Sequence, residues 1–513
     1  MERGTVATFQ NDGLIAAPLA AGADVAVHGR PEAAAPSPRG EALARNAPCP
    51  CGSTRRHKHC CGQLDADRFA ATLPQQQIAL LCRSAEHLLR GEGTQAAALL
   101  ARLRPEQMHD VLMAREAGEM CLDLHLLEPA QDFLERALLL RPDDDAARHA
   151  LHDCTRYRQR AQHWHAASLR IRECLARIAA AAQGVPRAAC EHVHVVSKLD
   201  TIGGTERRAL NLYRWLSERV PTILWSTHAP HPQHAAAAPI RCIEPGAVPH
   251  GGTLALVGTY FPCGDWLESA AFERVVISHN TTEQHLSLEQ RLAQLERNPS
   301  RPPVQLTFPS ALFRDATNLP GLVEYTPLDL EAFQRRRAST AIGSVTIGRH
   351  GRADLRKFHP NDAALFRTLL SRGHAVRVLG GTPLSPAFAT DPSARPELLE
   401  LGAQQAVAFL DSLDVFLYRK HPAFFETCGS VIMEAMAMQL PVVVFAGDVG
   451  AAELIRDGEN GFLVDSESAA LARIEQLAGD PALRARLGRA ARATIDACLR
   501  QQHTQQLATY LGA

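Results

Sequence analysis

From His192 onward, short runs rich in Val and Ile alternate with stretches of helical periodicity, and this alternation constrains the fold more than any other feature of the chain. The runs read VHVVS, TILWS, TLALVG, RVVIS, VQLTF, SVTIG, AVRVLG, VFLYR and PVVVFAG. Apolar strands that are each followed by a turn and a helix indicate parallel sheets covered on both faces. Two such series lie in residues 190–513, so the sequence predicts two doubly wound α/β domains.

The sequence before this region has a different character. Residues 1–45 contain Gly, Pro and Ala with little apolar periodicity, which predicts a disordered leader. A cysteine-rich segment follows at residues 46–62. Residues 70–185 contain long apolar-periodic stretches with almost no β-branched runs, which predicts an all-α segment.

Charge and hydropathy exclude several functional classes. The 54 Lys and Arg residues balance 55 Asp and Glu residues, and the net charge of −1 argues against a globally basic nucleic-acid binder. No run approaches the ~18 apolar residues of a membrane-spanning helix. Residues 14–27 are rich in Ala but are broken by Pro18, Gly22 and Asp24, which makes a poor signal peptide. We therefore expect a cytoplasmic protein.

Four of the thirteen cysteines lie close together, at Cys49, Cys51, Cys60 and Cys61. Four thiolates complete a tetrahedral zinc shell, and the segment is too short to fold around a hydrophobic core. The alternative is a flexible segment with incidental cysteines. The pattern CPCGS, followed by Cys-Cys, closely resembles the SEC-C motif, the zinc tail of the SecA translocation ATPase. The resemblance implies a structural zinc ion, held by these four cysteines, and a docking site for a protein partner.

The helical segment contains small residues at telling positions. In residues 111–144, Gly118, Ala130, Ala137 and Pro142 stand where a tetratricopeptide repeat has its small residues and its closing proline. We expect two or three degenerate repeats, with a plain helical bundle as the alternative.

Six arginines over residues 156–177 indicate a solvated helix face. The alternative for these arginines is a docking surface for the ribosome, an acidic lipid or an acidic protein.

Two carboxylates, Glu426 and Glu434, flank the point where the run VFLYR gives way to a helix that begins near Gly429. A loop at the carboxyl end of a parallel strand is where ligands bind in such folds. The backbone N–H groups of Gly429 and Ser430 would suit a diphosphate. Glu434 lies about two turns into the helix, within reach of a ribose hydroxyl pair. Taken alone, two carboxylates at this spacing could be ordinary surface groups.

The surrounding sequence resembles the retaining GT-B glycosyltransferases of family 4. Their E-x7-E signature continues here as EAMA at residues 434–437, PVV at 441–443 and G-x-x-E-x-I-x-D-G-x-x-G-x-L-V at 450–464. The resemblance covers most of residues 190–496. It implies an acceptor domain over residues 190–335, a nucleotide-sugar domain over residues 336–496, and a C-terminal helix over residues 497–513 that crosses back onto the first domain.

The resemblance also implies roles for single residues of the second domain. Glu426 would bind hydroxyl groups of the donor sugar. Arg349 and Lys357 would hold the nucleotide diphosphate and stabilise its charge as it leaves. The gap between these two cations is longer than is usual in the family, so Arg352 and Arg356 remain alternatives.

Two features of the first domain fit the same resemblance. Gly203 and Gly204 form a turn between a strand and a helix, where the backbone can approach a donor phosphate closely. His279 ends the run VVISH, and in the family such a histidine lies beside the reacting sugar carbon. The alternative is a capping or core histidine.

Together these features predict a cytoplasmic GT-B enzyme, preceded by an all-α repeat segment and a small zinc knuckle. It would transfer a sugar, with retention and without a catalytic metal, from a UDP- or GDP-linked donor to a glycan, a lipid-linked glycan or a protein. Closure of the two domains would exclude water. We expect a protein partner at the zinc motif and repeats, and no specific nucleic acid. One alternative is a protein O-glycosyltransferase whose repeats hold a polypeptide; another is a non-catalytic adaptor.

Overall fold

The computed structural model of the chain describes residues 73–89, 93–124, 126–186, 190–281, 285–337, 342–389, 395–421, 424–447 and 449–512. The expected leader and the expected zinc segment, with Cys49, Cys51, Cys60 and Cys61, lie outside these residues.

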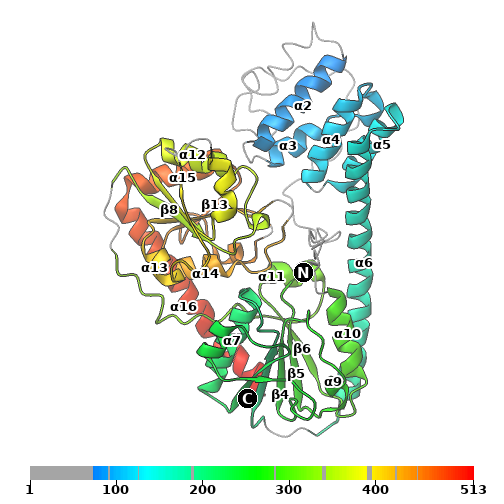
Figure 1. Cartoon of the computed structure of the whole chain (residues 1–513), viewed down its shortest axis with the longest axis vertical. Helices are drawn as coiled ribbons and strands as arrows, with labels where there is room; N and C mark the ends of the chain where they lie inside the picture. Colours follow the sequence, from blue (N-terminus) through cyan, green and yellow to red (C-terminus); the bar gives the residue numbers. More distant parts are fainter. Residues whose placement is uncertain are drawn as a thin grey trace, which may run out of the picture.

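The first helices form a separate helical unit, at the top of Figure 1. It consists of α2 (Leu73–Leu89), α3 (Gly93–Leu100), the 3-10 turn η3 (Pro105–Gln107), α4 (Val111–Asp123), α5 (Leu127–Leu140) and the start of α6 (Asp145–Ala182). A Cβ atom at Gly118 would lie 2.6 Å from Leu134 Cγ, and Ala130 and Ala137 are fully buried. The small residues therefore let α4 and α5 approach closely. The tetratricopeptide-like assignment stays a prediction.

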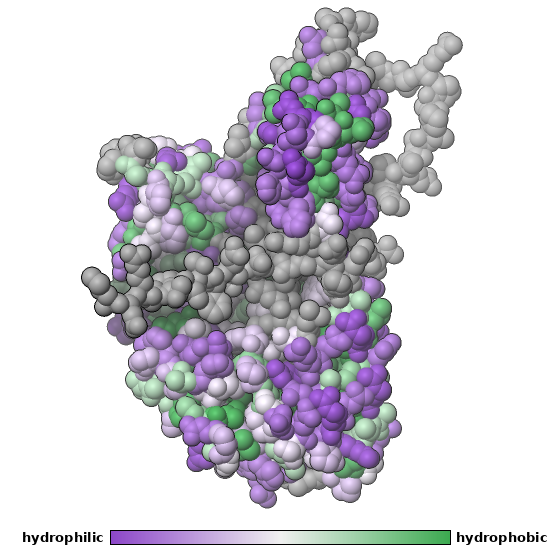
Figure 2. All heavy atoms as spheres, turned by 45° about the vertical axis from the view of Figure 1, so that its right-hand side comes forward, coloured by the Kyte–Doolittle hydropathy of each residue, from purple (hydrophilic) through white to green (hydrophobic). Residues whose placement is uncertain are grey.

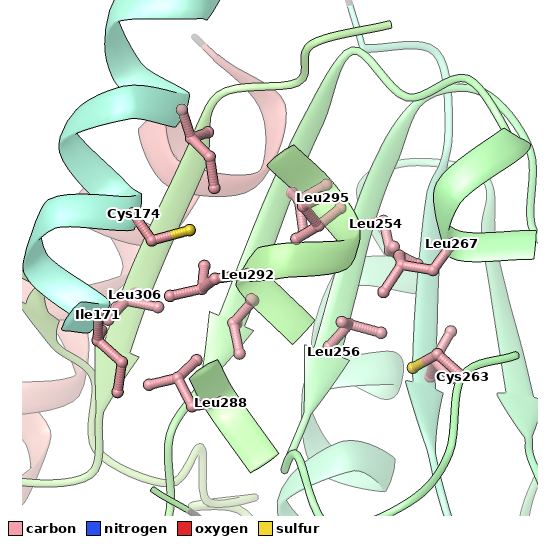
Figure 3. Close-up of a cluster of buried hydrophobic side chains, with 14 of the residues drawn as sticks. Ile171, Cys174, Leu254, Leu256, Cys263, Leu267, Leu288, Leu292, Leu295 and Leu306 are labelled. Carbon is pink, nitrogen blue, oxygen red and sulfur yellow. The ribbon is translucent and has the colours of Figure 1, made fainter. Parts of the chain in front are cut away.

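Helix α6 connects this unit to the first α/β domain (Figure 1). Figure 3 shows Ile171 and Cys174 of α6 lying against the leucines of α10 (His285–Glu296). Outside this core, Arg170 and Arg177 donate in pairs to Glu289 and Glu296 of α10, with Nη2–Oε2 distances of 3.0 and 3.2 Å. Two of the six arginines of α6 thus join α6 to the domain.

The first sheet has seven parallel strands among the described residues, in the order β3-β2-β1-β4-β5-β6-β7. The strands are β1 (Val193–Ser197), β2 (Thr222–Ser226), β3 (Ile240–Cys242), β4 (Thr253–Val257), β5 (Arg274–Ser278), β6 (Val304–Phe308) and β7 (Leu322–Val323). Helix α7 (Gly204–Ser217) covers one face, whereas α6, α9 (Trp266–Ser269) and α10 cover the other. Two short helices, α8 (Pro232–Ala237) and α11 (Ala311–Thr317), complete the domain.

The second sheet has six described strands, also parallel, in the order β10-β9-β8-β11-β12-β13. They are β8 (Thr346–His350), β9 (Ala375–Leu379), β10 (Glu397–Leu399), β11 (Val415–Tyr418), β12 (Val442–Phe445) and β13 (Phe462–Val464). The helices are α12 (Asp362–Ser371), α13 (Ala406–Asp411), α14 (Ser430–Ala437), α15 (Glu467–Gly479) and α16 (Pro481–Leu511), with 3-10 turns η5 (Leu355–Lys357), η6 (Thr382–Phe388) and η8 (Gly450–Leu454). The predicted fold class is confirmed: two Rossmann-like domains in the GT-B arrangement follow a helical segment.

Helix α16 belongs to both domains. The sequence predicted a tail helix from residue 497, but α16 runs without a break from Pro481, and the left-handed Gly512 ends it. It packs on α14 and then crosses to the first domain (Figure 1), as the resemblance implied. There Tyr510 is fully buried, and its carbonyl accepts a hydrogen bond from Thr253 Oγ1 at 2.7 Å.

Glu324, just after β7, anchors this crossing. Its buried carboxylate accepts hydrogen bonds from Arg208 Nη2 of α7 at 3.0 Å, and from Gln506 Nε2 at 2.7 Å and Tyr510 Oη at 2.9 Å of α16. Since a buried charge without partners costs several kcal/mol, these bonds hold α7, α16 and the interdomain segment together.

The described helices include none that is both long and apolar enough to cross a membrane. Figure 2 shows hydrophilic side chains over much of the visible surface, with hydrophobic ones among them on the helical unit at the top of the view. In that unit, Ile78, Leu112 and Leu139 are large apolar side chains with exposed fractions of 45, 50 and 72%.

We predict that Gly488→Ala destabilises the second domain by about 3 kcal/mol through overpacking. A Cβ at this position of α16 would lie 2.0 Å from the backbone oxygen of Gln439, which cannot move aside as a side chain would. Gly479→Ala is the matched control, because no atom beyond its chain neighbours and its own helix backbone lies within 4 Å of the Cβ it would add. Urea unfolding followed by circular dichroism would measure both variants, and equal unfolding midpoints would contradict the prediction.

Candidate active site

Loops at the carboxyl ends of strands from both sheets meet in the site. Asn280 follows β5, Ser310 follows β6 and Thr427 follows β11. Thr427 Oγ1 donates to the Asn280 backbone oxygen, and Ser310 Oγ donates to the Thr427 backbone oxygen, both at 2.6 Å. In doubly wound folds ligands bind at this edge of a sheet. The region between the two domains where these loops meet is therefore the candidate active site, and it is called the cleft below.

Glu426 and Lys357 form a largely buried ion pair on the second-domain side, each side chain with an exposed fraction of 13%. Lys357 Nζ and Tyr418 Oη both donate to Glu426 Oε2, each at 2.7 Å. Burial favours the neutral acid, but the charge and hydrogen bond of Lys357 and the hydroxyl of Tyr418 outweigh it and hold the pKa of Glu426 below its ordinary value. Glu426 is therefore an ionised carboxylate at neutral pH.

The guanidinium of Arg349 contacts the backbone next to this pair. Nη1 donates to the Arg419 carbonyl at 2.5 Å, and Nη2 donates to the Lys357 carbonyl at 2.8 Å. The group lies between the rings of Phe358 and Tyr418, at 4.8 and 4.7 Å from their centroids. Arg349 thus fixes the backbone of Lys357, and its role as a diphosphate ligand stays a prediction.

Arg352, the alternative cation, is exposed. Its positive charge helps to lower the pKa of Glu426 in the second domain. It also acts on Tyr260 of the first domain, where burial and the Glu206 carboxylate raise the pKa and Arg352 opposes them. The charge of Arg352 therefore acts on groups of both domains. The side chain of Arg356 is outside the described part of the structure.

Glu434, on α14, forms an ion pair with an arginine of the opposite domain. Arg207 Nη1 of α7 donates to Glu434 Oε1 at 2.9 Å, and His350 Nε2 lies 3.2 Å from Oε2. The Glu434 side chain is only 2% exposed, against 47% for Arg207. Burial lowers the pKa of His350, and the charge of Glu434 opposes this only in part.

The two predicted glycine positions lie at the edges of the same cleft. Gly203 caps α7, and a Cβ there would lie 2.4 Å from Glu206 Oε2, whereas Gly204 is open. The Glu206 carboxylate accepts hydrogen bonds from Tyr260 and Thr201. Glycine at 203 therefore makes room for a buried carboxylate at the start of α7.

Gly429 and Ser430 begin α14 beside Glu426. Gly429 has a φ of +76°, in the left-handed region that favours glycine, and Ser430 is the first helical residue. The N–H groups of the first turn of α14 have no acceptor four residues earlier within the helix. This helix start thus presents donors next to the Lys357–Glu426 pair.

His279 lies in a different environment from the residues above. It is fully buried at the end of β5, and the rings of Phe313 and Phe308 lie 5.3 and 6.0 Å from its own. Its proposed position beside a reacting sugar carbon stays a prediction.

Sequence reasoning missed several residues of this site. Arg207 comes three residues after Gly204, Asn280 follows His279, and Thr427 follows Glu426. Their neighbours in sequence were the available signal. Tyr418 and His350 end strands as apparently ordinary residues, and only the fold shows their contacts. Across the described residues, no group of three or more His, Cys, Asp or Glu side chains is arranged to hold a metal ion.

Two family models match the sequence. Residues 398–494, which include Glu426 and Glu434, match the family described as Glycosyl transferases group 1, and residues 45–63 match the SEC-C motif. The first match supports a glycosyltransferase. No curated protein matches the chain.

Solved structures with similar folds include Anabaena Alr3699/HepE in complex with UDP and glucose, with 14% identity over 62% of this chain and 100% of that one, at a TM-score of 0.46. A glycosyltransferase from Rickettsia africae gives 13% identity over 63% and 98%, at 0.48. WaaG, a glycosyltransferase involved in lipopolysaccharide biosynthesis, gives 12% over 63% and 100%, at 0.42. These scores are too low to carry an argument, so the fold rests on the strand orders above.

We predict that Lys357→Met destabilises the second domain by about 3 kcal/mol at pH 8, since it leaves the largely buried Glu426 carboxylate without its cation. The loss should shrink at pH 5. Without Lys357, burial raises the pKa of Glu426, so the carboxylate of the folded variant takes up a proton as the pH falls. In the intact protein the lowered pKa keeps Glu426 ionised at both pH values.

Urea unfolding at the two pH values measures this effect. The double variant Lys357→Met/Glu426→Gln is the control, because it removes the unpaired charge and should recover most of the stability. A loss that is equal at both pH values, or that persists in the double variant, would show that the ion pair does not act in this way.

Proposed function

We propose that this protein is a retaining glycosyltransferase that moves a sugar from a nucleotide-sugar donor to an acceptor without a catalytic metal. The observation that carries the proposal is the position of two carboxylates, Glu426 just before α14 and Glu434 within it. They lie where the carboxyl ends of two parallel sheets meet. The Glycosyl transferases group 1 match over the same residues supports it.

In this proposal, Glu434 and the start of α14 hold the nucleotide. Glu434 accepts hydrogen bonds from the ribose hydroxyl pair. The N–H groups of Gly429 and Ser430, with the positive end of the helix dipole, face the diphosphate. Gly203 and Gly204 allow the backbone of the opposite domain to approach the same phosphates.

Glu426 binds the donor sugar. Its two hydrogen bonds, from Lys357 and Tyr418, both reach Oε2. Among the described residues, neither of these two donors contacts Oε1, and this second oxygen therefore accepts a hydrogen bond from a sugar hydroxyl. As the bond between the anomeric carbon and the phosphate oxygen breaks, negative charge grows on the diphosphate, and the cationic groups beside it stabilise that charge.

The interface between the domains supports transfer in preference to hydrolysis. Glu453 of the second domain accepts hydrogen bonds from the backbone N–H groups of Ala311 and Leu312, both at 3.0 Å, and from Tyr325 Oη. With the Thr427 bonds, these contacts hold the domains against one another, and a closed cleft excludes water.

The SEC-C match supports a second part of the proposal. A structural zinc ion is held by Cys49, Cys51, Cys60 and Cys61, and this segment docks a protein partner.

A protein O-glycosyltransferase is the second candidate function. The helical unit reaches the second domain, because Asn361 Nδ2 donates to the Leu88 backbone oxygen at 3.1 Å. Asn361 follows Lys357 by only four residues. A polypeptide held by the helical unit would therefore lie beside the cleft.

We predict that one nucleotide class, among UDP-, GDP- and ADP-sugars, raises the thermal stability of the full chain. A ligand at about 100 times its dissociation constant adds about 2.7 kcal/mol. Glu434→Ala should abolish the shift because the ribose contact is lost. Glu426→Ala should keep the shift for the free nucleotide and lose turnover. The absence of a shift with every donor would overturn the proposed function.

For the second candidate, we predict that sugar from a labelled donor of that class enters the protein fraction of a cell lysate. Leu139→Glu, on the helical unit, should lower this labelling several-fold without changing donor hydrolysis. Leu401→Glu in the second domain, 49% exposed, is the matched control. Label that appears only in the lipid extract would exclude a polypeptide acceptor.

A further inference from the structure

Fewer cationic side chains are available to bind a phosphate at the cleft than the sequence suggests. The inference drawn from this rests on the function proposed above. Two N–H groups of Arg349 are engaged by backbone carbonyls, and the Lys357 ammonium is paired with Glu426. A nucleotide diphosphate brings two or more negative charges into this region. Among the described side chains of the cations that the sequence assigned to it, Arg349 and Lys357 are thus engaged, whereas Arg352 is exposed.

Arg207 is a further cation, and it comes from the opposite wall. It lies in the first turn of α7, three residues after Gly204. Its guanidinium carries five N–H donors, yet the one hydrogen bond it shows within the described structure is Nη1 to Glu434 Oε1 at 2.9 Å. Nearly half of the side-chain surface is exposed, at 47%, so the guanidinium is accessible to a ligand.

The carboxylate that Arg207 contacts is the one assigned to the ribose. Ribose hydroxyls that bind Glu434 compete with the guanidinium for the same buried oxygens. In a nucleotide the ribose hydroxyl pair is joined to the α-phosphate through the ribose ring, C5′ and O5′, a span that a long arginine side chain can cover. A guanidinium displaced from Glu434 by the ribose can therefore reach phosphate oxygens, for which its planar fork of donors is well suited.

We propose that Arg207 is a donor-binding residue that exchanges partners. In the empty cleft it neutralises Glu434 across the two domains. When a nucleoside diphosphate enters, the ribose takes Glu434, and the guanidinium binds the diphosphate from the first domain. The diphosphate then lies between cations of both domains, so donor binding holds the cleft closed.

The exchange predicts opposite effects on two probes. For whichever nucleotide class stabilises the wild-type protein, the probes are the nucleoside diphosphate (UDP, GDP or ADP) and its nucleoside (uridine, guanosine or adenosine). Arg207→Gln should weaken binding of the diphosphate about 10-fold or more, because a charge-assisted contact is lost. It should leave the nucleoside bound equally well or more tightly, because the ribose no longer competes with a cation. Isothermal titration calorimetry on the full chain would measure both affinities.

Two variants serve as controls. Arg214→Gln removes an exposed arginine from the same helix and should change neither affinity. Arg207→Lys keeps the charge without the fork, and it should show an intermediate loss for the diphosphate; it also carries the test if Arg207→Gln fails to fold.

The proposed function stands if the wild-type protein binds a nucleotide and Glu434→Ala abolishes this binding. Given that result, any one of three outcomes would overturn the inference about Arg207. Arg207→Gln could bind the diphosphate as the wild type does. It could bind both probes more tightly, which would make Arg207 a latch that only blocks the site. It could weaken both probes equally, which would show a loss of site shape. A wild-type protein that binds no nucleotide would overturn the proposed function, and this inference with it.

Discussion

The buried carboxylate of Glu324 is the contact on which the mutual placement of the two α/β domains depends. Arg208, Gln506 and Tyr510 all donate to it, from α7 at the cleft and from the end of α16. Because the same helix α7 carries Arg207 toward Glu434, the ionic contact across the cleft is held in place by a second one in the core. Loss of either α16 partner would leave a buried charge undercompensated, and α7 would lose its fixed orientation.

The charged residues at the cleft fix one another's positions. Arg349 holds the chain at Lys357, and Lys357 with Tyr418 holds one oxygen of Glu426. Each of these groups restricts the next, so the Glu426 carboxylate is already oriented in this structure, which contains no ligand. Preorganisation of this kind is what lets a low-dielectric site stabilise developing charge without reorganising at the moment of reaction.

How much the sequence could predict depends on how local the signal is. The nine apolar runs coincide with the central strands of both sheets, whereas the four missed strands, β3, β7, β10 and β13, are the sheet edges and only two or three residues long. Edge strands are partly exposed, so they lack the continuous apolar run. Glu426 and Glu434 were found because one strand-turn-helix unit contains both. Arg207 was not, because its partner lies 227 residues away, and the pairing of Arg170 with Glu289 spans 119 residues.

The position of Tyr510 has a consequence for how the protein is made. Its side chain is packed in the core beneath β1 and α7, although these elements leave the ribosome some three hundred residues earlier. The core of the first domain therefore stays incomplete, with an apolar surface exposed, until the second domain and α16 have been synthesised. Cotranslational folding of the two domains cannot proceed strictly one after the other, and a chain interrupted before Tyr510 leaves its earlier domain incomplete as well.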